Sequence, residues 1–257
     1  MSRDVFALLK ASKVTKPTTK TKTLASGAGG EKSKKEIGPV TLLTNNTSKS
    51  KWSVKGSHLI SKTPIDGLTG NWSSTEIPVA AFDLDSTLVE TTSGQKFARH
   101  AGDWRWFNDN TLAKLTQLIQ EKYLVVIFTN QGGVVASSAL GQPKFKSYTN
   151  FTNRVDQIIK ELLPADVLVF ASPKRPAAKS FKGPVSSEEV HRTMRKPESG
   201  MWASLIEYLA KQNYTVDMEK SFYVGDAAGR PKDFSDSDKK FAESVGIRFE
   251  TPEETFK

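Results

Sequence analysis

The stretch that most constrains this chain runs from Val79 to Leu88. Its first four residues, Val79-Ala80-Ala81-Phe82, are apolar and predict a strand buried on both faces, as in a parallel sheet. Two carboxylates, Asp83 and Asp85, follow directly. Ligands of open α/β sheets bind at the carboxyl ends of strands, so both acids are expected in a cleft. If the backbone stays extended there, their Cα atoms lie ~6.5 Å apart on one face, which leaves room for a phosphoryl group.

A buried strand that merely stops at an Asp-rich turn would show the same residues, so this alternative stays open on the stretch alone. The pattern Asp-x-Asp-x-Thr after a buried strand also resembles the first motif of the haloacid dehalogenase superfamily of phosphohydrolases. Whether partner residues follow downstream decides between the two.

Composition narrows the class of protein. The length of 257 residues fits one domain with a tail, or two small domains, and a hydrophobic content of 37% indicates that part of the chain is unpacked. The absence of cysteine excludes disulfides and thiolate zinc sites and suits a reducing compartment. No apolar run approaches the roughly 18 residues that span a bilayer, so no membrane partner is expected.

Residues 1–50 are predicted to be a disordered basic tail, and residues 51–257 the folded phosphatase domain. The tail contains ten Lys or Arg against three acids, although the net charge of the whole chain is only +9. Its cluster Lys32–Lys35 either aids nuclear import or holds DNA loosely, or it belongs to a solvated linker. The apolar segment 4–9 is either a short helix that binds a partner protein or a frayed end, and the frayed end is the favoured account. We expect a nuclear protein.

The Gly-rich segment 27–33 has a superficial likeness to a P-loop. Its lysine stands one place too late and no buried strand precedes it, so a nucleotide kinase site is rejected.

Beyond Asp83 the apolar pattern alternates between strand and helix. Strands are predicted at 124–128, 167–170, 221–224 and 247–249, with an edge strand or hairpin at 57–62. Helices are predicted around 112–119, which Asn108 or Asp109 caps, then at 151–162, at 200–212 and after Ser235, with a long loop at 172–199. This order predicts an α/β fold with a doubly wound, mostly parallel sheet of the Rossmann type, right-handed crossovers and a minimal cap.

Parallel strands place their carboxyl ends on one rim, and three of these ends carry residues suited to phosphate chemistry. They are Asp83 with Asp85, Thr129 with Asn130, and Asp226. Carboxylate oxygens suit Mg²⁺, so Asp83 and Asp226 are predicted ligands, with a backbone carbonyl near Asp85 as a third.

The same residues predict a mechanism. Asp83 attacks phosphorus to form an aspartyl-phosphate, and Asp85 acts as acid and then base. Thr129 donates to a phosphoryl oxygen, and Lys196, from the long loop, neutralises the charge that develops. Taken alone, Lys196 would be a surface lysine.

Other polar and aromatic residues leave alternatives open. Asp233 and Asp238 either reach the metal's waters or serve as helix caps or surface acids, and the second account is favoured for each. Trp104 and Trp106 either stack on a frayed base or pack in the core, which is the favoured account.

At this point the chain from about Trp52 to Phe256 resembles the polynucleotide 3′-phosphatases, the DNA-repair branch of the haloacid dehalogenase superfamily. The stretches that carry the resemblance are Phe82-Asp-Leu-Asp-Ser-Thr-Leu88, Ser93-Gly94, Asp103-Trp104-Arg105, Phe128-Thr-Asn-Gln131, Arg195-Lys-Pro197, Ser199-Gly-Met-Trp202, Val224-Gly-Asp-Ala-Ala-Gly-Arg-Pro231, Lys232-Asp-Phe-Ser235 and Thr251-Pro-Glu-Glu254.

This resemblance implies Asp83 as nucleophile, Asp85 as acid/base, Thr129 and Lys196 on phosphate and Asp226 on Mg²⁺. With it, the residues expected to bind substrate are Thr129, Asn130, Lys196, Arg195, Arg230, Ser93 and Gly94. The metal set is Asp83, Asp85 and Asp226.

The chain departs from the family at three places. Ser86 stands where Gly is more usual, the loop from Pro173 to Thr193 is longer and more basic than expected, and the chain stops where bifunctional members continue into a kinase domain. We therefore expect no 5′-kinase activity.

The preferred hypothesis is a monomeric, Mg²⁺-dependent phosphatase that removes 3′-terminal phosphate from DNA ends, nicks or gaps. Seven Lys or Arg between Pro173 and Lys196 would contact the phosphate backbone of DNA, unless this loop is merely solvated. One alternative is a phosphatase of small metabolites such as histidinol phosphate or sugar phosphates. Another is a non-catalytic scaffold that binds DNA ends.

Overall fold

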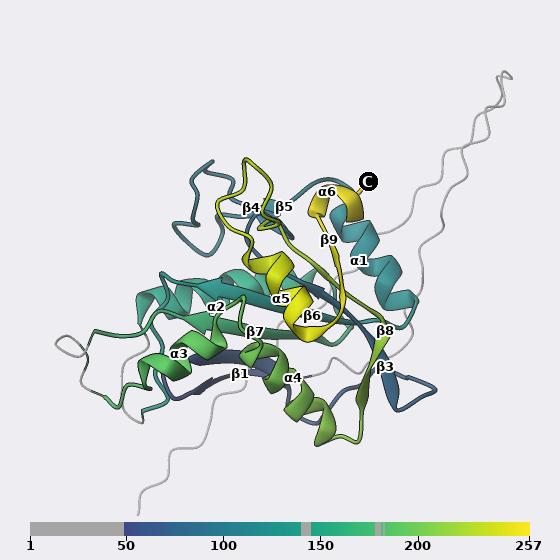
Figure 1. The fold of residues 1–257 in the computed structure, drawn as a ribbon, viewed down its shortest axis with the longest axis horizontal. Coiled ribbons are helices and arrows are strands. Elements are labelled where there is room, and N and C mark those ends of the chain that lie inside the picture. Colours follow the sequence, from purple (N-terminus) through teal and green to yellow (C-terminus); the bar gives the residue numbers. More distant parts are fainter. Residues whose placement is uncertain (1–48, 140–144, 178–180, 182) are drawn as a thin grey trace, which may run out of the picture. The chain divides into compact units, whose positions relative to one another are not determined.

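The computed structural model describes residues 49–139, 145–177, 181 and 183–257. The predicted disordered tail lies outside these residues apart from its last two positions, and so do the basic cluster, the apolar segment and the Gly-rich segment predicted in it. After an initial run of strands, helices and strands largely alternate along the described chain (Figure 1).

A seven-stranded sheet with the order β1-β2-β7-β6-β3-β8-β9 lies at the centre (Figure 1). Its strands are β1 (Ser50–Lys55), β2 (Leu59–Pro64), β3 (Glu76–Phe82), β6 (Leu124–Gln131), β7 (Val167–Pro173), β8 (Thr215–Val224) and β9 (Arg248–Glu250). The five strands from β7 to β9 in this order are parallel, and the β1–β2 hairpin joins β7 in an antiparallel manner. The mostly parallel sheet is confirmed, and the segment predicted as an edge strand or hairpin is a hairpin.

Helices cover both faces of the sheet. They are α1 (Thr111–Gln120), α2 (Lys146–Lys160), α3 (Glu188–Met194), α4 (Gly200–Ala210), α5 (Ser237–Val245) and α6 (Pro252–Thr255). One core cluster joins α1 and α2 to Ala80 and Phe82 of β3, and a second joins α4 and α5 to Val79 and Ala81. Successive residues of a strand face opposite sides, so both faces of β3 are buried from Val79 to Phe82 and this part of the strand is apolar. The doubly wound arrangement is confirmed.

Three predicted boundaries are corrected. The N-cap of α1 is Asn110 and not Asn108 or Asp109, although Asn108 Oδ1 accepts hydrogen bonds from Asn110 N and Thr111 Oγ1. The predicted loop 172–199 contains α3, whose N-cap Ser187 accepts a hydrogen bond from Val190 N. Strand β8 begins at Thr215, ahead of the predicted Ser221.

The cap over the sheet's rim is small. Between β3 and β6 the described chain forms the two-stranded ribbon of β4 (Val89–Glu90) and β5 (Arg105–Trp106), the loop that joins them, and α1. The predicted minimal cap is therefore confirmed. Among the described residues, no helix has both the length and the apolar character that crossing a membrane requires.

Candidate active site

The carboxyl ends of β3, β6 and β8 meet at a pocket of about 900 Å³. Most of the predicted site residues line it, namely Asp83, Asp85, Thr129, Asn130, Arg195, Lys196 and Asp226. Because β3 lies between β6 and β8 in the sheet, these three strand ends are neighbours in space although they are far apart in the sequence. The structure thus brings the predicted constellation together.

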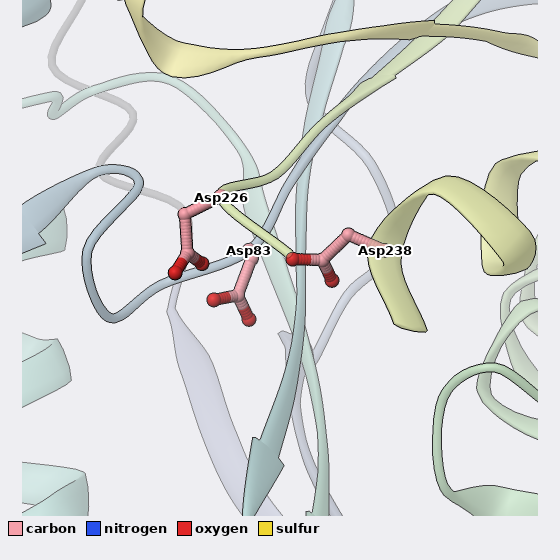
Figure 2. A group of neighbouring side chains, drawn as sticks. All are labelled: Asp83, Asp226 and Asp238. Atoms are coloured by element: carbon pink, nitrogen blue, oxygen red, sulfur yellow. The ribbon is translucent and has the colours of Figure 1, made fainter. Parts of the chain in front are cut away.

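Three carboxylates approach one another at the base of this pocket. Asp83 follows β3, Asp226 follows β8, and Asp238 lies in the first turn of α5 (Figure 2). Each offers an oxygen within 4.8 Å of an oxygen of the other two. An all-oxygen donor set is the kind that Mg²⁺ prefers, so the residues present fit this metal.

The charge balance of this carboxylate cluster also fits a cation. Burial, together with repulsion from Asp238 and Asp226, raises the pKa of Asp83 to about 8, although Lys196 opposes the shift. Burial likewise raises the pKa of Asp226 to about 6, with Asp238 acting in the same direction and Lys196 against it. One ammonium does not balance three clustered carboxylates, and a divalent cation would supply the missing positive charge.

Lys196 is the positive centre of the cluster. Its side chain is buried, and its Nζ donates to Asp83 Oδ1, Asp238 Oδ1 and Tyr223 Oη, each at 2.7 Å. Burial lowers the pKa of Lys196, but the attraction of Asp238 and Asp83 outweighs it and the net shift is upward. Lys196 is therefore an ammonium whose position beside Asp83 is fixed, which is the placement predicted from the sequence.

Backbone contacts hold these residues in place. The side-chain amide of Asn130 makes two hydrogen bonds of 3.0 Å with the backbone of Lys196. Asn130 Nδ2 donates to the carbonyl oxygen of Lys196, and the backbone N–H of Lys196 donates to Asn130 Oδ1. Thr87 Oγ1 is buried and accepts the backbone N–H of Asp226 at 3.0 Å. The hydroxyl of the Asp-x-Asp-x-Thr pattern thus links the loop after β3 to the loop after β8.

Asp85 faces a different set of partners. Arg154 of α2 donates from Nη1 to Asp85 Oδ1 at 2.7 Å and from Nη2 to Oδ2 at 3.2 Å. Gln131 Nε2 donates to Asp85 Oδ2 at 2.8 Å and to Thr129 Oγ1 at 2.9 Å. The Asp85 carboxylate is not a member of the three-carboxylate cluster, so its predicted metal role would fall to its backbone carbonyl.

Ser86, between these two groups, has a φ of +62°. This is the left-handed region, which glycine adopts without steric cost and serine does not. The conformation gives a physical reason why Gly is more usual at this position.

Three predicted substrate-binding residues do not line the pocket. Ser93 donates from its N and Oγ to the buried Asp103, and Gly94 lies in the same loop. The guanidinium of Arg230 pairs with Asp233 and Glu253. Substrate binding by Ser93, Gly94 and Arg230 stays a prediction without a geometric basis in this structure.

The favoured account of Asp238 as a helix cap or surface acid is wrong. The residue is 2% exposed and lies at the centre of the site, whereas a cap or surface position was favoured. Asp233 instead holds Arg230 and the N–H of Ala228, outside the carboxylate cluster. Trp104 and Trp106 form an edge-on pair 5.6 Å apart that packs against the core, as favoured.

Arg154 and Asp238 share a signal that periodicity alone can supply. Arg154 occupies the apolar face of α2 with Phe151 and Ile158, and Asp238 occupies that of α5 with Phe241. A charged residue in register with buried positions of a helix indicates a buried partner of opposite charge.

Comparisons with known proteins identify the family to which this chain belongs. A family model described as polynucleotide kinase 3 phosphatase matches residues 78–256. The bifunctional polynucleotide phosphatase/kinase of Schizosaccharomyces pombe is 37% identical over 176 residues, which cover 68% of this chain and 36% of that protein. The polynucleotide 3′-phosphatase of Saccharomyces cerevisiae is 35% identical over 214 residues, covering 69% and 87%.

The polynucleotide 3′-phosphatase ZDP of Arabidopsis thaliana is 34% identical over 178 residues, which cover 69% of this chain and 24% of that protein. This chain therefore matches most of the budding yeast protein but only about a third of the fission yeast protein and a quarter of the plant protein. Because the family model spans residues 78–256, which include the whole carboxylate cluster and Lys196, the chain belongs to the polynucleotide kinase 3 phosphatase family.

Proposed function

We propose that this protein is a Mg²⁺-dependent polynucleotide 3′-phosphatase that removes the 3′-terminal phosphate from damaged DNA ends, nicks or gaps. The observation that carries the proposal is the convergence of Asp83, Lys196 and Asp226 on one pocket, with the Lys196 Nζ 2.7 Å from Asp83 Oδ1. The names of the yeast and plant relatives supply the substrate class.

Asp83, Asp226 and Asp238 would hold the metal. When bound, Mg²⁺ supplies positive charge against the phosphate dianion, which would otherwise repel the carboxylate of Asp83. Lys196 and the hydroxyl of Thr129 bind the remaining phosphoryl oxygens, because both line the same pocket as Asp83.

In the first step, a carboxylate oxygen of Asp83 forms a bond to phosphorus while the bond to the 3′ oxygen of the nucleotide breaks. Asp85 gives a proton to that departing oxygen. In the second step, Asp85 takes a proton from water, whose oxygen then displaces Asp83 from phosphorus and releases inorganic phosphate. Arg154 and Gln131 orient the carboxylate of Asp85 for both transfers.

Further parts of the proposal depend on the sequence. We place the protein in the nucleus and expect it to act as a monomer, with the basic tail available to a repair protein. We expect no 5′-kinase activity, because the Gly-rich segment 27–33 departs from the P-loop pattern.

The test is release of inorganic phosphate from 3′-phosphorylated DNA, 5′-phosphorylated DNA and a sugar phosphate, each with Mg²⁺ and with chelator. We expect release from the 3′-phosphorylated strand alone, only with Mg²⁺, and none from the variant Asp83→Asn. Asp217→Asn, which removes an acid that is paired with Lys220 on β8, is the matched control and should retain activity.

Each alternative has its own outcome in this assay. Preferential turnover of the sugar phosphate would support the small-metabolite phosphatase. Binding of nicked DNA without metal-dependent release would support the scaffold. Normal turnover by Asp83→Asn would remove Asp83 from the mechanism.

A further inference from the structure

Two phenylalanines stand exposed at the mouth of the active-site pocket. Phe97 is 71% exposed and Phe234 is 69% exposed, the highest values among the large apolar side chains of the described residues. Both line the pocket that contains Asp83. They come from distant parts of the chain, Phe97 from the loop between β4 and β5 and Phe234 from the segment between β8 and α5. Exposed aromatic rings that meet at a pocket mouth indicate a binding surface.

A lysine lies against both rings. The Nζ of Lys96 is 5.7 Å from the ring centroid of Phe97 and 4.8 Å from that of Phe234. No carboxylate among the described residues forms an ion pair with Lys96. The mouth therefore combines two flat apolar faces with a cation that no carboxylate in that part of the chain neutralises.

The loop that carries Lys96 and Phe97 is held in place by hydrogen bonds to the buried carboxylate of Asp103. Asp103 is 1% exposed, and its carboxylate accepts hydrogen bonds from Thr92 Oγ1, from the N and Oγ of Ser93, and from Arg99 N at 2.8–3.0 Å. These bonds fasten the loop on both sides of Phe97. The exposed ring is thus carried by a loop that is already held in place, so less conformational entropy is lost when the ring contacts a ligand.

The chemistry of this surface selects a ligand. Every nucleobase has a planar π-face that can stack on a phenyl ring, and stacking on aromatic side chains is tolerant of sequence. A cation between the rings suits the backbone phosphates that link successive nucleotides.

We propose that Phe97 and Phe234, with Lys96 between them, form a stacking site for the terminal nucleobases of the strand whose 3′ phosphate enters the pocket. The inference rests on the proposed function and deepens it, because it assigns recognition of the polymer to this aromatic rim and not to the phosphate site.

The test measures binding by fluorescence anisotropy with two labelled 3′-phosphorylated oligonucleotides, one with ordinary bases and one whose last two nucleotides are abasic. The wild-type protein is expected to bind the ordinary strand more tightly, by about 5- to 150-fold for each base that stacks. The double variant Phe97→Leu/Phe234→Leu should lose this discrimination. Phe97→Trp, which keeps a flat ring, should retain it.

A parallel assay measures phosphate release from the ordinary strand. The double variant should show a raised KM with kcat retained, because the substituted rings lie outside the carboxylate cluster. Equal binding of the two strands by the wild-type protein, or unchanged discrimination in the double variant, would overturn the stacking site. Discrimination without any phosphate release would sustain the stacking site and refute the proposed function.

Discussion

The guanidinium of Arg154 donates two hydrogen bonds to the carboxylate of Asp85, from Nη1 to Oδ1 at 2.7 Å and from Nη2 to Oδ2 at 3.2 Å. The side chain of Arg154 is only 6% exposed, so the pair is fixed from the protein side. Two parallel bonds define the orientation of a carboxylate as well as its position. Arg154 is therefore a positioning residue for the proposed acid and base.

We expect Arg154→Gln to lower kcat about 10- to 100-fold with little change in KM, because a misplaced catalytic group costs rate without removing phosphate contacts. Arg154→Lys should recover only part of the loss, since an ammonium cannot make both bonds. The measurement is steady-state turnover of a 3′-phosphorylated oligonucleotide. Arg105→Gln, which breaks an exposed ion pair with Glu90, is the control. A wild-type kcat in Arg154→Gln would contradict the positioning role.

Asp238 yields a prediction about metal affinity. It supplies one of the three clustered carboxylates and also holds Lys196 at 2.7 Å. Asp238→Asn should therefore raise the Mg²⁺ concentration for half-maximal activity about 10- to 100-fold, the usual range when a group that supports a metal is replaced. Glu243→Gln makes the same charge change on the exposed side of α5 and should leave the Mg²⁺ dependence unchanged. An identical Mg²⁺ titration in both variants would exclude Asp238 from the metal site.

The order of strands and helices is predictable because it depends on local periodicity. The run from Val79 to Phe82 is apolar at every position, since its alternate residues face the two helical layers. The residues of the site at the strand ends follow from the same argument, because parallel strands must place their carboxyl ends together.

Other members of the site depend on how a helix docks, which composition does not reveal. The periodicity of α5 places Asp238 on the buried face of the helix, but which groups it meets there depends on how α5 packs, and Asp233 ahead of the helix pairs with Arg230 instead. The rim formed by Phe97 and Phe234 depends on two loops that meet in space, and no periodicity connects them. Trp104 and Trp106 pack against the core, which is the account that the sequence favours for them.

The raised pKa values of the carboxylate cluster predict how stability depends on pH. Asp83 has a pKa of about 8 and Asp226 of about 6, chiefly because of burial, against roughly 3.9 for aspartate in an unfolded chain. At pH values between the unfolded and the folded pKa of each group, the metal-free folded state binds more protons than the unfolded state. Its stability is therefore highest below about pH 4 on account of these two groups, and this contribution is lost as the pH rises through 6 and 8.

Mg²⁺ requires the ionised carboxylates, so its stabilising effect should have the opposite pH dependence. We expect Mg²⁺ to raise the melting temperature strongly at about pH 8.5 and weakly at about pH 5.5, because protons compete for the same oxygens at the lower pH. Thermal unfolding with Mg²⁺ and with chelator at both pH values measures this difference. Subtracting the melting temperature with chelator from that with Mg²⁺ at each pH cancels the effect of groups that titrate outside the cluster. A Mg²⁺ shift of equal size at both pH values would show that the clustered carboxylates do not bind the metal.

Ser86 yields the last prediction, which concerns strain next to the nucleophile. Its φ of +62° costs a residue with a Cβ roughly 1–2 kcal/mol, while glycine adopts it freely. Glycine also has more entropy in the unfolded chain, which offsets part of this relief, so the net effect of Ser86→Gly should be a stabilisation of up to about 1 kcal/mol. Urea unfolding of the metal-free protein measures the change. Ser53→Gly, in the exposed strand β1, should instead destabilise it, because its backbone is extended and glycine weakens a strand. If both variants lose stability alike, the conformation of Ser86 stores no strain that glycine can relieve.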